Sequence, residues 1–265
     1  MEPGIYNIPF DQYLSLDRVS NSYLSRLSKV PAMAKIKTEA TPAMTFGTAF
    51  HSFILEPDKF SHQVAVCPKC DRRTKAGKEV YADFTAESTG KVVISIDEFE
   101  TIQSMRESIS RHPAAARLLS GGIAEQSVLF NLESNNGTII KCKARTDFLT
   151  PNGIVVDLKT TKDASQHSFL RSILNFKYYL QASFYMTGLS KISDKYERFI
   201  FIAIEPNPPF RCEVYELSDE FLEYGYFKIK DLLELELKCR GYDFWPNYQN
   251  DDITIIEKPN YLGYP

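Results

Sequence analysis

Three short strand-like segments separated by two turn signals constrain the fold of this chain most strongly. The segments are residues 125–132, 138–149 and 154–159, and the turn signals between them are Asn135-Asn136-Gly137 and Pro151-Asn152-Gly153. Asn-Gly sequences between apolar runs of this length are typical of tight hairpin turns. We therefore expect three consecutive antiparallel strands, which form a meander.

Helical patterns lie on both sides of the meander, and two more strand patterns follow it. Helices are predicted after Ser20-Asn21 and at 44–55, 97–120, 166–189 and 219–239, with strands at 197–204 and 211–216. This order indicates an α/β fold in which helices flank a central mixed β-sheet. No Gly/Ser linker divides the chain, so one domain is predicted over 1–265. It has a helical N-terminal part to about 122, a sheet-and-helix core over about 123–217, and a C-terminal helix and tail from about 218.

Composition limits the classes of protein that this chain can belong to. A net charge of −3 argues against a protein that coats DNA, but it allows an enzyme with one positive groove. No apolar stretch approaches the roughly 20 residues of a membrane span, and the N-terminus lacks a secretory pattern. A cytoplasmic location and no membrane partner are therefore expected.

The cysteines and a basic segment each allow two interpretations. Five scattered cysteines do not suggest a disulfide framework, and Cys67 and Cys70 resemble half a zinc site without a matching second pair. The segment 67–78 is either a solvated loop or a loop that contacts phosphate groups. Its basic residues are Lys69, Arg72, Arg73, Lys75 and Lys78.

The tripeptide Asp157-Leu-Lys159 follows directly after the apolar run 154–156. An acid two residues before a lysine is expected about twice in a chain of ordinary composition. The second instance here, Glu236-Leu-Lys238, lies in a strongly charged helical pattern without an apolar run before it. We therefore interpret the second instance as helix surface and the first as a candidate site.

Strand geometry places further acids beside Asp157. Side chains alternate along a strand, so Asp157 and Lys159 project from the same face. If both turns close as three-residue loops, Asp147 lies opposite Asp157, and Glu125 lies opposite Asp147. A two-residue loop at either turn would break this row of three carboxylates.

Such a row has two explanations. The acids can lie on a solvent-exposed face and pair with Lys141, Lys143 and Arg145, or they can hold a divalent cation. The apolar run before Asp157 indicates a buried strand, where unpaired carboxylates are costly. The metal-binding explanation is therefore favoured, with Lys159 placed to fix a water molecule or a phosphate oxygen.

Two helical patterns complete a set of motifs. His51 lies beside the apolar stripe of the predicted helix 44–55, whereas Lys177, Gln181 and Tyr185 recur on one ridge of the predicted helix 166–189. In order, His51, Glu125, Asp147, Asp157-x-Lys159 and Gln181-x-x-x-Tyr185 resemble the motifs of RecB-like PD-(D/E)xK nucleases. The chain is most similar to the RecE exonuclease family over most of residues 5–215. The matching segments are Phe46-Gly-Thr-Ala-Phe-His51, Arg72-Arg-Thr-Lys-Ala-Gly-Lys78, Val156-Asp-Leu-Lys-Thr-Thr161 and Tyr179-Leu-Gln-Ala-Ser-Phe-Tyr185.

This resemblance implies a restriction-endonuclease-like core and a magnesium-dependent 5′→3′ exonuclease acting on the ends of double-stranded DNA, with Mn²⁺ able to substitute. It also implies 3′ overhangs for phage-type recombination, an annealing protein as partner, and a ring-shaped homo-oligomer. The metal ligands it implies are His51, Asp147, Asp157 and the Leu158 carbonyl. The catalytic residues it implies are Lys159, Asp147, Asp157, Glu125, Gln181 and Tyr185. Expected nucleic-acid contacts are Arg72, Arg73, Lys75, Lys78, Arg145, Lys177, Gln181 and Tyr185.

Two alternative functions stay open. A repair or structure-selective nuclease of the same superfamily would act on single strands or DNA ends. An inactive DNA-binding scaffold would have the same fold, although the intact Asp147, Asp157 and Lys159 argue against it. An iron–sulfur nuclease is rejected, because only Cys239 follows Cys212.

Overall fold

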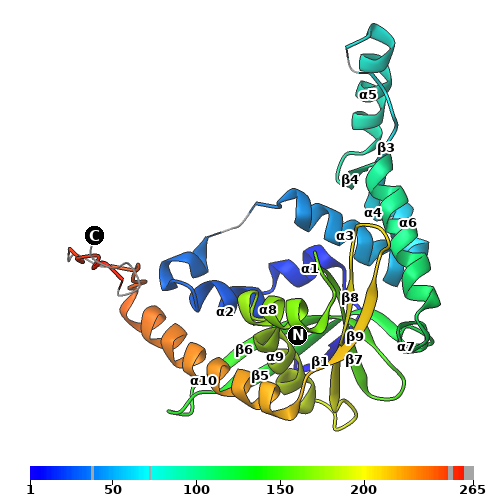
Figure 1. The fold of residues 1–265 in the computed structure, drawn as a ribbon. Coiled ribbons are helices and arrows are strands. Elements are labelled where there is room, and N and C mark those ends of the chain that lie inside the picture. Colours follow the sequence, from blue (N-terminus) through cyan, green and yellow to red (C-terminus); the bar gives the residue numbers. More distant parts are fainter. Residues whose placement is uncertain (37–38, 72, 250–252, 260–265) are drawn as a thin grey trace.

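A seven-stranded mixed β-sheet forms the centre of the molecule in the computed structural model, which describes residues 1–36, 39–71, 73–249 and 253–259 (Figure 1). The strand order is β1-β5-β6-β7-β8-β9, and β2 pairs in parallel with β6. The strands are β1 (Gly4–Tyr6), β2 (Val19–Ser20), β5 (Ile123–Glu133), β6 (Ile139–Leu149), β7 (Ile154–Thr160), β8 (Arg198–Ile204) and β9 (Cys212–Glu216). The predicted central mixed sheet is confirmed.

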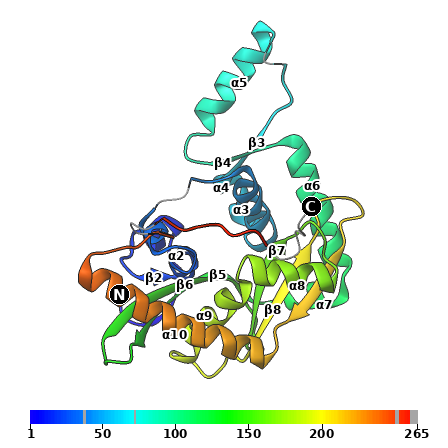
Figure 2. The same cartoon turned by 60° about the vertical axis from the view of Figure 1, so that its left-hand side comes forward.

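Helices cover both faces of this sheet, as Figures 1 and 2 show. One face packs against α2 (Asn21–Leu27), α8 (Gln166–Asn175), α9 (Tyr178–Ser190) and α10 (Asp219–Tyr242). The other face packs against α3 (Pro42–Leu55), α6 (Ile96–Arg111) and α7 (Pro113–Leu118). Strand alternation explains the two cores, because Val155 belongs to the first and Val156 to the second. Shorter elements are α1 (Phe10–Ser15), η1 (Pro31–Lys35), η2 (Pro57–Lys59) and α4 (Phe60–Gln63).

The predicted meander is confirmed, and both of its turns close as three-residue loops. The Ser134 amide donates to the Thr138 carbonyl at 3.0 Å, and the Thr150 amide donates to the Ile154 carbonyl at 2.9 Å. Gly153 is required at the second turn, because its φ is +77° and an added Cβ would lie 2.0 Å from the Lys195 carbonyl oxygen.

Two predicted helices are each divided in the structure. The helix predicted at 97–120 breaks at His112, because Pro113 has no amide hydrogen and begins α7 instead. The helix predicted at 166–189 breaks between α8 and α9, where Lys177 has φ +58°. Lys177 is therefore the N-cap of α9, and the prediction that it shares a helical ridge with Gln181 and Tyr185 is wrong.

An arm that the sequence patterns did not predict projects from the body of the molecule (Figures 1 and 2). It consists of the parallel pair β3 (Val64–Cys67) and β4 (Val92–Ser95) together with α5 (Lys75–Glu87). Part of the segment expected as a loop is thus helical, since Thr74 caps α5 and Lys75 begins it. Arg72 lies outside the described residues.

The second acid–x–lysine tripeptide lies on α10, as its helical pattern predicted. However, Glu236 is only 1% exposed and pairs with Arg240 at 2.6 Å, so the interpretation of this acid as helix surface is wrong. The helix turns Glu236 toward the core while Lys238 stays exposed. Within the part of the chain that the structure describes, no helix, α10 included, is both long and apolar enough to cross a membrane.

Candidate active site

Asp157 and Lys159 project from the same face of β7, as strand alternation predicts. The Asp157 side chain is 1% exposed, and Lys159 Nζ lies 2.5 Å from its Oδ2 atom. Gln181 on α9 donates from Nε2 to Asp157 Oδ1 at 2.7 Å. Oδ1 of Asp157 therefore accepts a hydrogen bond, whereas the buried Oδ2 accepts none among the described residues and has only the ion-pair contact with Lys159.

Asp147 lies beyond the last paired residues of β6 and β7. The ladder ends at the Phe148–Val156 pair, and the same register places Asp147 opposite Asp157. Because the ladder stops there, the Leu158 amide is free to donate to Asp147 Oδ2, at 2.8 Å. The end of strand pairing thus aims the Asp147 carboxylate along the edge of β7.

Glu125 lies opposite Asp147 on β5 in the predicted register, between the pairs Ala124–Phe148 and Gln126–Thr146. Its φ of +53° is a left-handed conformation that non-glycine residues seldom adopt, so this strand carries local strain. The Glu125 carboxylate accepts from Arg145 Nε at 2.7 Å.

His51 reaches the same place from helix α3. Its Nδ1 atom lies 3.4 Å from Asp147 Oδ2, and its Nε2 atom lies 3.1 Å from the Leu158 carbonyl oxygen. One ligand atom each from His51, Glu125 and Asp147 lies within 4.8 Å of the others. Helix α3 and the hairpin of β5 and β6 therefore bring a nitrogen and two carboxylates to one point.

Burial shifts the proton affinities of this cluster. Burial raises the pKa of Asp147 and of Asp157 to about 6, and for Asp157 the neighbouring Asp147 charge adds to the effect. Burial and then the Lys159 charge lower the pKa of His51. Burial opposes the charge of Lys159, but Asp157 and Asp147 outweigh it, so the Lys159 pKa is raised. At neutral pH, Asp147 and Asp157 are therefore ionised, His51 is a neutral imidazole and Lys159 is an ammonium.

This donor set suits a hard divalent cation. Two carboxylates and one imidazole match Mg²⁺ or Mn²⁺ better than a thiolate-preferring metal. The structure gathers Glu125 with His51 and Asp147, whereas the sequence prediction placed Asp157 in that group. The Leu158 carbonyl, which was also predicted as a ligand, lies against His51 Nε2.

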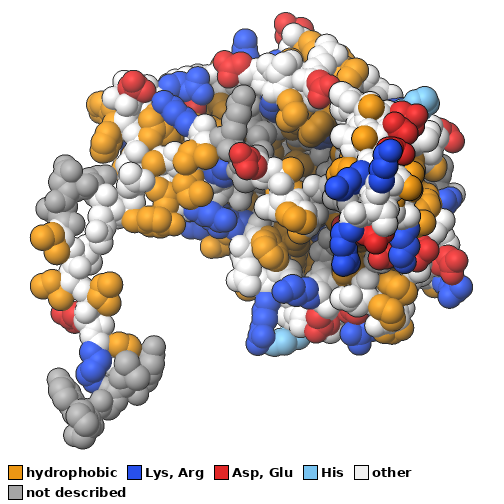
Figure 3. All heavy atoms as spheres, turned by 90° about the horizontal axis from the view of Figure 1, so that it is seen from above, with side chains coloured by type: hydrophobic (Ala, Val, Ile, Leu, Met, Phe, Trp, Pro, Cys, Tyr) orange, Lys and Arg blue, Asp and Glu red, His pale blue; other side chains and the backbone are white. Residues whose placement is uncertain are grey.

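The residues predicted to contact nucleic acid fall into two groups. Tyr185 lies buried on α9 beside Gln181, and Arg145 is held by Glu125, close to the carboxylates. Lys177 donates to the Ser28 hydroxyl instead of sharing the ridge of α9. Three further residues of this set belong to the arm and not to the carboxylate cluster: Arg73, Lys75 and Lys78. Seen from above, Lys and Arg side chains are interspersed with Asp and Glu (Figure 3).

Tyr178 is a site residue that sequence reasoning missed. The Lys159 ammonium lies 4.8 Å from the centre of its ring, an arrangement that favours the charged form of the lysine. The break before α9 places Tyr178 there, and the break left no recognisable spacing in the sequence.

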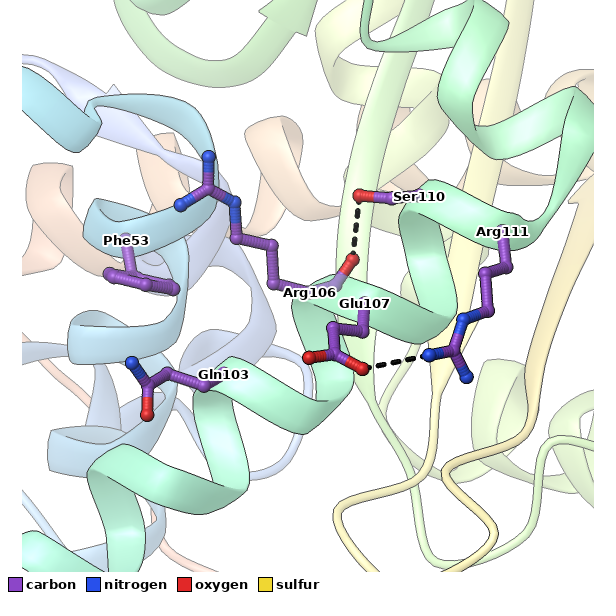
Figure 4. A pocket seen from close by; sticks show the side chains of 6 residues that line it. All are labelled: Phe53, Gln103, Arg106, Glu107, Ser110 and Arg111. Atoms are coloured by element: carbon purple, nitrogen blue, oxygen red, sulfur yellow. Dashed lines mark hydrogen bonds and ion pairs between the residues drawn. The ribbon is translucent and has the colours of Figure 1, made fainter.

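A surface pocket of about 420 Å³ lies away from these residues, between α3 and α6 (Figure 4). Arg106 lies over the Phe53 ring at 5.1 Å, and Arg111 pairs with Glu107 at 2.9 Å. None of the carboxylates of the site lines it. The lining residues are Phe53, Gln103, Arg106, Glu107, Ser110 and Arg111.

Comparison with known proteins agrees with this fold. Residues 19–257 match the family described as PDDEXK-like domain of unknown function (DUF3799), and the chain belongs to that family. The PD-(D/E)xK resemblance and the restriction-endonuclease-like fold are confirmed. Among curated proteins, no sequence match is found.

A solved structure of the same fold is found. A candidate exonuclease from Eubacterium rectale superposes with a TM-score of 0.63 at 14% identity, over 96% of each chain. LHK-Exo in complex with dAMP gives a TM-score of 0.27 at 14% identity, over 76% of this chain and 96% of that one. The second likeness is too weak to support any inference about this chain.

Proposed function

We propose that this protein is a divalent-metal-dependent exodeoxyribonuclease that degrades one strand of linear double-stranded DNA. The observation that carries the proposal is the convergence of His51, Glu125 and Asp147 within 4.8 Å, beside the Asp157–Lys159 ion pair. Carboxylates and a lysine around a metal site are suited to phosphodiester hydrolysis. The exonuclease description of the Eubacterium rectale protein supports the same activity.

His51, Glu125 and Asp147 would hold a Mg²⁺ or Mn²⁺ ion, and Asp157 would join them as a ligand only if its contact with Lys159 opened. A bound ion would polarise the scissile phosphate and lower the pKa of the attacking water. The Leu158 amide fixes Asp147, and Arg145 fixes Glu125, so both carboxylates are oriented before substrate binds.

Lys159 would act as an electrostatic group in this mechanism. Its two neighbouring carboxylates raise its pKa, so it stays protonated at neutral pH and can donate to a phosphate oxygen. An ammonium that is already in place stabilises charge as it develops on the phosphate. Gln181 would hold Asp157 toward Lys159, and Tyr185 would support Gln181 from the same helix.

The wider role follows from the RecE-like resemblance. We propose 5′→3′ polarity, 3′ overhangs handed to a single-strand annealing protein, and a homo-oligomeric ring around the duplex. Residues 1–265 would form one catalytic domain. The exposed Lys75 and Lys78 at the start of α5 are placed on the arm, where they can contact the DNA backbone.

Digestion of linear duplex DNA tests this proposal. The duplex carries a label at the 5′ end or at the 3′ end of one strand. The reaction is started with Mg²⁺, and EDTA is then added to remove the metal. Early release of the 5′ label with retention of the 3′ label, stopped by EDTA, is expected. Release of neither label in Mg²⁺ or Mn²⁺ would contradict the proposal, and digestion of single strands alone would indicate a repair-type nuclease instead.

A further inference from the structure

The exposed ring of Phe176 is connected to Lys159 of the site through one intervening ring, that of Tyr178. Phe176 occupies the break between α8 and α9, and 64% of its surface is exposed. Its ring stacks on Tyr178 at 5.6 Å with an interplanar angle of 27°. The ring of Tyr178 in turn carries the Lys159 ammonium at 4.8 Å.

This arrangement is rigid on the side facing the protein. Phe169 and Phe201 contact Tyr178 at ring distances of 6.2 and 5.7 Å, so the tyrosine cannot swing away. Both of these phenylalanines are buried. One face of Phe176 therefore rests on a fixed ring, and the other face is open to solvent.

A lysine follows the exposed ring in the chain. Lys177 follows Phe176 directly, and its side chain donates to the Ser28 hydroxyl at the end of α2. Lys29 directly follows Ser28 in the chain and is exposed, so Lys177 contacts the residue beside a second lysine. Partial burial and the Lys29 charge lower the pKa of Lys177. An open aromatic face followed in the chain by a lysine matches the recognition of single-stranded nucleic acid, in which bases stack and lysines meet phosphates.

We propose that Phe176 is the stacking platform for an unpaired nucleobase next to the scissile phosphate. This inference rests on the proposed nuclease function and adds that the strand enters the site with its terminal base pair opened. The base would lie on the solvent face of Phe176, and Tyr178 would support the ring from behind. Lys177 and Lys29 would contact the neighbouring phosphate.

A duplex with 2-aminopurine as the terminal base of each strand tests this site, because the probe loses fluorescence when it stacks on an aromatic ring. Binding is measured in Ca²⁺, with the DNA checked to be intact on a gel. Wild type and Phe176→Trp are expected to quench the probe. Phe176→Ala and Phe176→Leu are expected to lose the quenching and to bind about tenfold more weakly. With Mg²⁺, the same two variants should show a raised KM and a kcat within about twofold of wild type.

Phe227→Ala is the matched control. Phe227 is 55% exposed on α10, and its ring contacts Tyr226 at 5.9 Å. Quenching and affinity in Phe176→Ala equal to those of Phe227→Ala would overturn the inference, as would wild-type behaviour of Phe176→Leu. If the wild type quenches the probe but digests no DNA, the stacking site stands and the nuclease proposal fails. If the wild type digests DNA while Phe176→Ala matches the control, only the stacking site fails.

Discussion

The two acid–x–lysine tripeptides of this chain make a comparison within one molecule. Asp157 and Glu236 are equally buried, at 1% exposure, and each is paired with a cation. On β7, residues two apart share a face, so Lys159 itself is the partner of Asp157. On α10, residues two apart point in different directions, and the partner of Glu236 is Arg240, four residues on.

The difference lies in what surrounds each pair. Asp157 lies opposite a second acid, Asp147, across the end of the β6–β7 ladder, and His51 lies beside Asp147. Glu236 has its cation on the same helix, where Arg240 donates to its Oε1 atom from both Nε and an Nη atom. Burial and ion pairing are therefore common to a site and to a structural contact. The candidate site differs from the structural contact because it has a second acid on the neighbouring strand and a lysine on the same face of the same strand.

Replacement of the two lysines should give the largest contrast. Lys159→Ala removes the ammonium that stabilises charge on the phosphate, and we expect DNA hydrolysis to fall by about 10²–10³-fold. Lys238→Ala removes an exposed lysine and should keep the wild-type rate. Single-turnover digestion of linear duplex in Mg²⁺ measures both, and equal rates for the two variants would remove Lys159 from the mechanism.

Low pH should slow DNA hydrolysis by protonating the carboxylates of Asp157 and Asp147. The proposed mechanism needs an ionised Asp147 as a metal ligand and an ionised Asp157 as the partner of Lys159, and burial is the main cause that raises both pKa values to about 6. Activity is therefore expected to rise with pH up to about 6 and then level off, with a loss of at least about tenfold per pH unit below it, because two carboxylates must be ionised. A rate that stays constant from pH 7 down to pH 5 would contradict this assignment.

The same shifts predict how metal and pH change stability. A folded pKa near 6 lies above the unfolded value of about 3.9, so the metal-free folded state loses stability as pH rises between these values. At pH 7, Mg²⁺ or Mn²⁺ should offset this cost and raise Tm by several degrees. Asp147→Asn should be more stable than wild type without metal and should not respond to it. Equal Tm increases in both proteins would show that the metal binds elsewhere.

Arg240→Ala tests the second tripeptide. The substitution leaves the Glu236 carboxylate buried without its cation, and we expect a loss of about 1–3 kcal/mol in unfolding free energy. DNA hydrolysis per folded molecule should not change. Urea unfolding followed by a digestion assay measures both quantities, with Lys238→Ala as the control on the same helix. A loss of activity without a loss of stability would show that α10 contributes to the site.

The smallest effect is expected on the arm. Lys75→Ala and Lys78→Ala each remove one candidate phosphate contact, so affinity for DNA should fall modestly and the salt dependence of binding should weaken by about one unit of slope. Titrations at several salt concentrations measure this slope. Slopes equal to that of Lys238→Ala would show that Lys75 and Lys78 face solvent and do not contact DNA phosphates.

The sequence predicted the register of the site because turn length and strand parity are local properties. Three-residue loops at both turns place Glu125, Asp147 and Asp157 in one row, and the structure has this register. The break at Pro113 was also accessible, because proline cannot continue a helix ladder.

Other features depend on tertiary contacts that no local pattern contains. Lys177 adopts φ +58° without a glycine, and Glu125 adopts φ +53° inside a strand. The burial of Glu236 depends on helix packing, and Tyr178 reaches Lys159 only because α9 starts after the break. The arm was missed because its strands, each of four residues, pair with each other across a long insertion.

A side-by-side rate measurement of Asp157→Asn and Glu236→Gln tests the central claim most directly. Both substitutions replace a buried, ion-paired carboxylate with a neutral amide of similar size. In single-turnover digestion of linear duplex with Mg²⁺, Asp157→Asn is expected to lose about 10²-fold or more, because a charge of the site is removed. Glu236→Gln is expected to stay within about threefold of wild type once the folded fraction is accounted for. Similar rates in the two variants would contradict the claim that Asp157-Leu-Lys159 is the catalytic tripeptide.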